Sequence, residues 1–223
     1  VENLEQKMAK DGYLDGSDMA TTFNMLRSND LIWSFVINNY LMGEAPPVFD
    51  LLYWNSDSTR MPARMHSEYL RTMYLENRFK EPGGMTLAGV PIDISSIKTS
   101  CYFLSTQDDH IAPWRSTFAG AGLFKGPVRF VPSGSGHIAG VVNPSEADKY
   151  GYWTSRSRPR GDADTWQAKA SAKQVSWWPD WQKWATKFTG TRVKARLPGA
   201  KKAFPALEAA PGSYASVRLD SPN

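Results

Sequence analysis

Two short polar loops, each placed directly after a strand-like run, constrain the fold of this chain more than any other feature. Residues 100–105 and 127–131 are apolar runs of the length typical of buried strands. The first is followed by a loop with Asp109 and a helix that Pro113 opens, and the second by a Gly-rich loop with His137. The order strand, acid, helix, strand, histidine predicts two parallel strands of an α/β sheet.

The two loops carry the residue types of a catalytic acid and a catalytic base. Loops that follow adjacent parallel strands lie at the same edge of a sheet, and the spacing from Asp109 to His137 matches one strand-helix-strand step. In a catalytic triad the carboxylate orients the imidazole and stabilises its charged form. An ordinary role stays open for each residue, because Asp108 or Asp109 can cap the Pro113 helix and His137 can be a structural histidine.

No nucleophile accompanies this pair. The sequence contains no Ser or Cys in the Gly-x-Ser-x-Gly or Gly-x-Cys-x-Gly pattern of a nucleophile elbow. The single cysteine, Cys101, lies in an apolar run without glycine, which favours a buried structural thiol. His110 can orient its neighbour or the substrate, or lie on the surface, and His66 is expected to be structural. No spacing of His, Cys and carboxylates predicts a metal site, and no cofactor is expected.

The sequence divides into three expected segments. Residues 1–89 predict a largely helical segment, with helices over about 31–41 and 62–77. Residues 90–150 have the rhythm of an α/β core and carry both loops. Residues 151–223 predict a helical tail rich in tryptophan. The tryptophans at helical spacing, which should pack on the domain, are Trp177, Trp181 and Trp184.

The excess of positive charge lies late in the chain. The formal net charge is +4, and between residues 187 and 218 seven Lys and Arg residues stand against one acidic residue, Glu208. These cations are scattered and not interleaved with stacking aromatics, which favours a solvated tail over nucleic-acid binding. The apolar runs are too short to span a membrane, the start lacks the features of a secretory signal, and one cysteine fits the cytoplasm.

Six segments spread along most of the chain carry a family likeness. They are Asn29–Trp33, Phe49–Arg60, Asp109–Trp114, Ser135–Pro144, Ser176–Trp181 and Glu208–Tyr214. Together they resemble the C-terminal half of a polyhydroxyalkanoate synthase. The last two segments resemble the single-polypeptide class I enzymes, which prefer short-chain substrates such as 3-hydroxybutyryl-CoA.

The resemblance implies an acyltransferase that polymerises (R)-3-hydroxyacyl-CoA into polyester and releases CoA by Cys-His-Asp covalent catalysis. It implies an α/β-hydrolase core under a mobile cap, a homodimer, and work on the surface of a cytoplasmic polyester granule. By resemblance Asp109 is the acid and His137 is the base. His110 and Trp114 are candidates to contact the substrate or to support the pair. Residues from about 11 to 89 would correspond to cap and cap-to-core segments.

The family's catalytic cysteine lies in an elbow that the resemblance places upstream of this sequence. We therefore expect the chain alone to be inactive, and a sheet without its central strands to expose unpaired edges and apolar surface. Two other functions stay open: an esterase or polyester depolymerase of the same architecture, and a non-enzymatic module that coats an apolar granule.

Overall fold

The chain forms two compact units in a computed structural model. One unit comprises residues 1–75 and 194–223, and the other residues 76–193. The described residues are 1–26, 28–46, 59–197, 199–213 and 217. Most of the Phe49–Arg60 segment, and Tyr214 of the 208–214 segment, therefore lie outside the described residues.

The first unit joins its opening helix to a helix that is distant in sequence. α1 (Glu2–Asp11) ends at Gly12, and the chain continues into β1 (Tyr13–Leu14), which pairs antiparallel with β2 (Met61–Pro62). That pairing brings α4 (Ala63–Tyr69) against α1. The buried side chains of the two helices are Met8 and His66, and an ion pair of 2.6 Å joins Glu5 to Arg71.

The two helices predicted in the first segment are present, with a wider turn than expected. α2 (Gly16–Leu26) is followed by η1 (Asn29–Trp33) and η2 (Val36–Leu41), and α4 continues into η3 (Leu70–Leu75). In η1, η2 and η3 the turns are π-helical, so that the Met42 N–H reaches the Ile37 carbonyl five residues back, at 2.9 Å. A two-residue hairpin of β9 (Ala200–Lys201) and β10 (Phe204–Pro205) belongs to the same unit.

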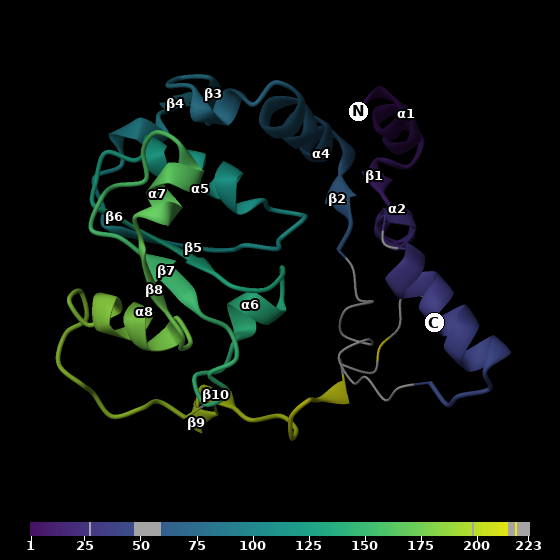
Figure 1. The fold of residues 1–223 in the computed structure, drawn as a ribbon. Coiled ribbons are helices and arrows are strands. Elements are labelled where there is room, and N and C mark those ends of the chain that lie inside the picture. Colours follow the sequence, from purple (N-terminus) through teal and green to yellow (C-terminus); the bar gives the residue numbers. More distant parts are fainter. Residues whose placement is uncertain (27, 47–58, 198, 214–216, 218–223) are drawn as a thin grey trace. The chain divides into compact units, whose positions relative to one another are not determined.

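The second unit is built on a four-stranded sheet in the order β5-β6-β7-β8 (Figure 1). β5 (Cys101–Thr106) and β6 (Val128–Ser133) run parallel, with α5 (Trp114–Leu123) as the crossover between them. β7 (Tyr152–Thr154) and β8 (Ser171–Lys173) extend the sheet antiparallel. The mixed α/β class predicted from the sequence is confirmed.

Several short elements precede this sheet in the chain, and two short strands extend it at one edge. Before β5 the chain forms η4 (Arg78–Lys80), the hairpin of β3 (Met85–Leu87) and β4 (Val90–Ile92), and η5 (Ile94–Ser96). β7 and β8 come from residues predicted as helical tail. Each is only three residues long, too short to show an alternating apolar pattern. β7 pairs with β6 on one side and with β8 on the other.

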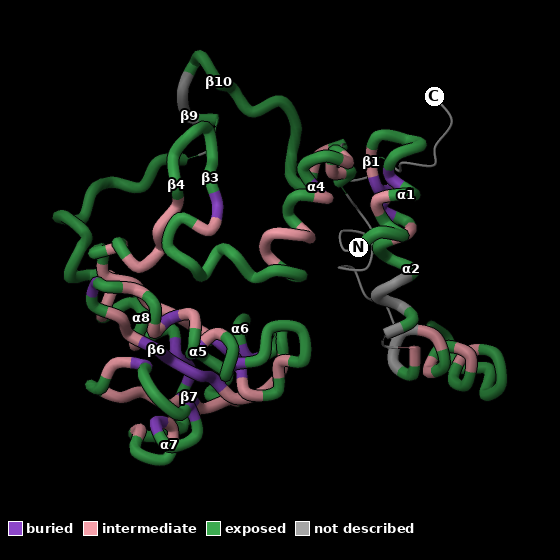
Figure 2. Tube along the Cα trace, turned by 90° about the horizontal axis from the view of Figure 1, so that it is seen from above, coloured by how far each residue is buried: buried purple, intermediate pink, exposed green. Residues whose placement is uncertain are grey.

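Helices cover both faces of the sheet. Side chains alternate between the faces of a strand, so Phe130 and Val131 of β6 point in opposite directions. Phe130 packs with α5 and α7 (Ala163–Ala168), whereas Val131 packs with Tyr152 and with Trp177, which immediately precedes α8 (Trp178–Ala185). Figure 2 shows the buried stretch that runs along β6. Of the three tryptophans expected to pack on the domain, Trp177 and Trp184 contact the sheet, whereas Trp181 is 39% exposed.

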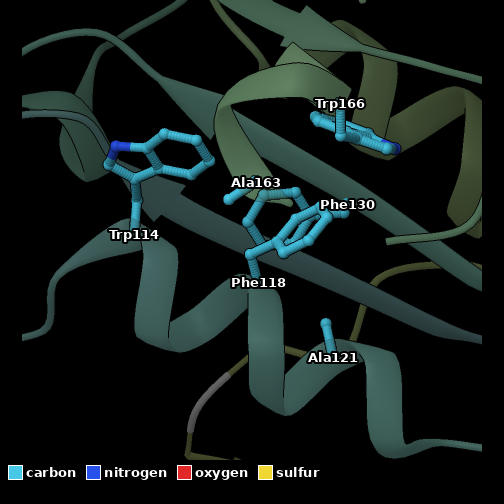
Figure 3. Packing of buried hydrophobic residues seen from close by; sticks show 6 residues of the cluster. All are labelled: Trp114, Phe118, Ala121, Phe130, Ala163 and Trp166. Carbon is cyan, nitrogen blue, oxygen red and sulfur yellow. The ribbon is translucent and has the colours of Figure 1, made fainter. Parts of the chain in front are cut away.

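The larger core cluster is aromatic and lies under α5. Figure 3 shows its six buried members, which are Trp114, Phe118, Ala121, Phe130, Ala163 and Trp166. The Phe118 ring sits 5.3 Å from that of Phe130 and 5.5 Å from that of Trp166, in edge-on and tilted arrangements that aromatic rings prefer. This cluster links the crossover helix, the sheet and α7.

Truncating a side chain at the centre of this cluster tests how much the cluster contributes to the stability of the fold. We expect Phe118→Ala to lower the free energy of unfolding by about 3–5 kcal/mol, because it removes a buried ring that three others contact. Leu123→Ala on the same helix, at a side chain that is 38% exposed, should cost about 1 kcal/mol or less. Equilibrium urea unfolding of the complete polypeptide measures both, and equal losses would contradict the prediction.

Candidate active site

The parallel pairing of β5 and β6 brings the two predicted loops to one edge of the sheet. The register ends with Thr106 opposite Ser133, so both strands stop at the same level. Two backbone hydrogen bonds continue beyond the strands, from the Gln107 N–H to the Ser133 carbonyl at 2.9 Å and from the Asp108 N–H to the Ser135 carbonyl at 3.0 Å. The loops are therefore tied together before either functional side chain is reached.

The carboxylate of Asp109 faces the imidazole of His137. One oxygen, Oδ2, lies 2.9 Å from His137 Nδ1. The other, Oδ1, accepts hydrogen bonds of 2.9 Å from the backbone N–H groups of Ile111 and Ala112. Asp109 does not cap the following helix: the residue at its N-cap is Pro113, without a side-chain hydrogen bond. The two backbone hydrogen bonds to Oδ1 thus orient the carboxylate so that Oδ2 faces His137.

The surroundings of Asp109 favour its ionised form. The side chain is only 7% exposed, and this burial acts to raise the pKa of the carboxyl group. Hydrogen bonds from the Ala112 N–H, from His137 and from the Ile111 N–H outweigh burial and hold the pKa below its usual range. A charged carboxylate at Nδ1 places the ring proton on that nitrogen, and His137 keeps Nε2 for a second partner.

His137 is more accessible than its partner, because 45% of its side chain is exposed. The loop that carries it begins with Gly134, whose N–H bonds to the Gly151 carbonyl at 2.8 Å, and passes through Ser135 at a φ of 70°. A positive φ is uncommon for a residue with a side chain and occurs at sharp turns near functional sites. The turn presents the imidazole at the surface of this unit.

The other predicted site residues lie in different surroundings. His110 is exposed in the Asp109 loop, and a contact with substrate stays a prediction. Trp114 is buried in the aromatic core and packs on Phe118. Cys101 is the first residue of β5, the end remote from Asp109, and five residues of strand span about 17 Å. In this structure the thiol is half-buried and lies near the Thr99 carbonyl.

Gly140 forms the tightest contact behind the site. It lies in α6 (Ala139–Val142), the short helix that follows His137, and it is buried. A Cβ atom here would come within 2.3 Å of the Gly134 carbonyl oxygen and 2.5 Å of Thr106 Cγ2. Only a residue without a side chain allows α6 to approach the end of β5 and the start of the His137 loop this closely.

Comparison with known proteins identifies the family. A poly(3-hydroxyalkanoate) polymerase subunit of Rhizobium meliloti is 53% identical over 98% of this chain, and a poly(3-hydroxyalkanoate) polymerase of Methylorubrum extorquens is 49% identical over 98%. The corresponding subunit of Cupriavidus necator is 41% identical over 92%. The chain belongs to the poly(3-hydroxyalkanoate) polymerase family. It spans about a third of the length of these relatives, 35% to 36%.

No protein-family model matches this chain. In its described parts, no helix is long and apolar enough to cross a membrane. Within the same residues, no group of three or more His, Cys, Asp and Glu side chains is arranged to hold a metal ion.

Several contacts around the His137 loop were not expected from the sequence. The Ser133 hydroxyl donates to the Gly140 carbonyl at 3.1 Å, and the Asn143 amide donates to the Tyr150 carbonyl at 2.9 Å. The indoles of Trp177 and Trp178 reach the same loop from 36 residues away. No local pattern predicts such contacts, since they depend on how the last helix crosses the sheet.

Adding a methyl group at Gly140 tests the close approach of α6. We expect Gly140→Ala to lower the free energy of unfolding by about 1–3 kcal/mol, because its Cβ would overlap two fixed atoms. Gly120→Ala in α5 is the matched control, since nothing lies within 4 Å of that position and alanine favours helix. Urea unfolding of the complete polypeptide measures both, and a neutral Gly140→Ala would contradict the packing.

The low pKa of Asp109 predicts a pH-dependent contribution to stability. A group whose pKa is lower in the folded state stabilises the fold above its unfolded pKa, near 3.9, and loses that effect as the pH falls through the folded value. Asp109→Asn should therefore be less stable than the parent by about 1–3 kcal/mol above pH 4, and this gap should shrink on acidification. Urea unfolding from pH 3 to 7 checks it.

Asp108→Asn is the control for that measurement. The Asp108 side chain is exposed, and among the described residues its carboxylate has no hydrogen-bond partner. The Asp108→Asn variant should follow the parent at every pH. A stability gap for Asp109→Asn that stays constant across this pH range would contradict the assigned cause.

Proposed function

We propose that this chain supplies the general base and its orienting acid to a polymerase that joins (R)-3-hydroxyacyl groups from CoA thioesters into polyester and releases CoA. The observation that carries the proposal is the 2.9 Å contact between Asp109 Oδ2 and His137 Nδ1, at the ends of two paired parallel strands, in a chain related to poly(3-hydroxyalkanoate) polymerases. The nucleophile is a cysteine outside this chain. The substrates are short-chain hydroxyacyl-CoA thioesters, and 3-hydroxybutyryl-CoA is the expected one.

In the first step His137 acts as general base through Nε2. It takes the proton of the cysteine thiol, and the thiolate attacks the carbonyl carbon of the acyl-CoA thioester. The tetrahedral intermediate then breaks its bond to the CoA sulfur, and the CoA thiolate leaves with the proton from His137. Asp109 keeps the Nδ1 proton in place and stabilises the imidazolium that forms in between.

In the second step the bound acyl group is transferred to a hydroxyl. The 3-hydroxyl of another hydroxyacyl group loses its proton to His137, with help from Asp109, and its oxygen attacks the enzyme thioester. The new ester forms as the bond from the acyl carbon to the cysteine sulfur breaks, and the leaving thiolate takes the proton that His137 holds. Backbone N–H groups would stabilise the negative oxygen of each tetrahedral intermediate.

The rest of the proposal concerns the complete enzyme. The sheet of the second unit forms part of an α/β-hydrolase core, and the described helices of the first unit belong to the cap segment, which contributes to a homodimer. The complete enzyme works in the cytoplasm at the surface of a polyester granule. The present chain, without its nucleophile, is inactive.

Release of free thiol from 3-hydroxybutyryl-CoA tests the proposal in the complete polypeptide that contains this chain. We expect His137→Ala to lower the rate of CoA release about a thousandfold, because the base is lost. Asp109→Asn should also cause a large loss, since the amide cannot stabilise an imidazolium. Asp108→Asn, which changes an adjacent exposed carboxylate, should leave the rate unchanged.

Three outcomes would contradict the proposed function. Unchanged CoA release in His137→Ala excludes this residue as the base. Hydrolysis of acyl esters by the parent, with free acid and no polymer as product, indicates an esterase or depolymerase instead. Binding to polyester granules that persists without any CoA release from the parent indicates a non-enzymatic coat module.

A further inference from the structure

The short helix behind His137 ends on four consecutive carbonyl groups that each accept a hydrogen bond from a side chain. Helices leave their last four carbonyls without a partner of their own, and one turn of helix is not stable by itself. At the end of α6 these carbonyls belong to residues 140–142 and to Asn143, the residue that caps the helix. The donors, in order, are Ser133 Oγ at 3.1 Å, Trp177 Nε1 at 3.1 Å, Trp178 Nε1 at 2.9 Å and Ser176 Oγ at 2.6 Å.

Three of these four donors come from one tripeptide, Ser176-Trp177-Trp178, which lies just before or at the start of α8. Ser176 is fully buried, and Trp177 is 6% exposed. The two indole rings stack with their centroids 4.2 Å apart, so the N–H of each points to an adjacent carbonyl of the same turn. Trp178 is 38% exposed, yet its N–H is directed at the Val142 carbonyl.

The tripeptide is itself anchored on the two strands that carry the candidate site. Arg129 of β6 donates to both carboxylate oxygens of Asp180 in α8, with its Nε 2.7 Å from Oδ2. The Tyr102 hydroxyl of β5 donates to the same Oδ2 at 3.0 Å. Burial, and then the charge of Asp180, raise the pKa of Tyr102, which keeps its hydroxyl protonated. Trp177 itself packs with Val131 of β6 and with Tyr102 of β5.

We infer that Ser176, Trp177 and Trp178 are positioning residues. They fix the position of the His137 loop so that its imidazole stays within hydrogen-bond distance of Asp109. The loop is tied at its start by β6 and the bond from Gly134 to Gly151. At its far end, α6 is secured by the tripeptide, whose anchor is the sheet that also carries Asp109. Asp109 and His137, which are 2.9 Å apart, are thus both held in place by the same sheet. The kinetic consequence rests on the proposed function, whereas the structural one does not.

Exchange of the backbone amides of residues 134–143 in the complete polypeptide gives a readout without any assay of activity. Trp177→Phe and Trp178→Phe each remove one indole N–H and keep an aromatic ring. We expect hydrogen exchange in this segment to speed up several-fold in each variant, and more in the double variant, because the helix end loses its partners. Exchange in β5, measured in the same experiment, should stay slow.

Kinetics provide the second readout. Both variants should lower kcat for CoA release about tenfold and leave KM within twofold, because a displaced base affects the reacting geometry and not the initial binding. Trp181→Phe is the matched control, since Trp181 lies on the same helix and packs on the Trp178 ring at 5.7 Å. Among the described residues its indole N–H has no hydrogen-bond acceptor, so this variant should behave as the parent.

Each result decides the inference. Exchange in 134–143 that matches the Trp181→Phe control overturns it, as does a rise in KM with kcat unchanged. Faster exchange throughout the second unit, with a lower urea midpoint, shows a general packing role and also overturns it. The side chain of Trp178 is partly exposed, so Trp178→Phe is expected to fold and keeps the test valid if Trp177→Phe does not fold. If the parent releases no CoA, the proposed function fails, and the exchange result alone decides the positioning role.

Discussion

The parallel hydrogen bonding of β5 to β6, in a register that ends both strands together, is the constraint on which the rest of the site depends. It places Asp109 and His137 at one edge although 28 residues separate them. The backbone bonds from Gln107 and Asp108 extend the pairing into the loops. Parallel strands need a crossover, and α5 provides it while filling the aromatic core below. One pairing therefore sets the topology, the core and the geometry of the candidate acid and base.

On the face of the sheet opposite α5, side chains of β5 and β6 bind α8. Asp180, with Arg129 and Tyr102, ties α8 to the two strands that bear the loops. The tryptophans at the start of that helix then reach back to the turn after His137. A segment distant in sequence thereby supports the histidine from behind, and the tryptophan-rich motif has a role beyond the burial of apolar surface.

Local patterns were informative where local physics dominates. Apolar runs predicted both long strands, and the proline opened α5 as expected. Of the three tryptophans at helical spacing, Trp181 and Trp184 lie in α8, and Trp184 packs on the sheet. The patterns failed for β7 and β8, whose three-residue strands exist only through their neighbours. They also missed the π-helical turns of η1 and η2, because intrinsic propensity does not distinguish that winding from an α-helix.

The sequence by itself determined the α/β class and the order of acid and histidine, and its motifs already resembled the family that the relatives then showed. Both the class and the order follow from residue type and spacing along the chain. Only the tertiary structure decided that Asp109 binds His137 while Trp114 lies in the core, and that Trp177 and Trp178 hold the turn behind the histidine. These contacts join residues far apart in sequence, and their geometry is set by sheet register and helix packing, which no local pattern encodes.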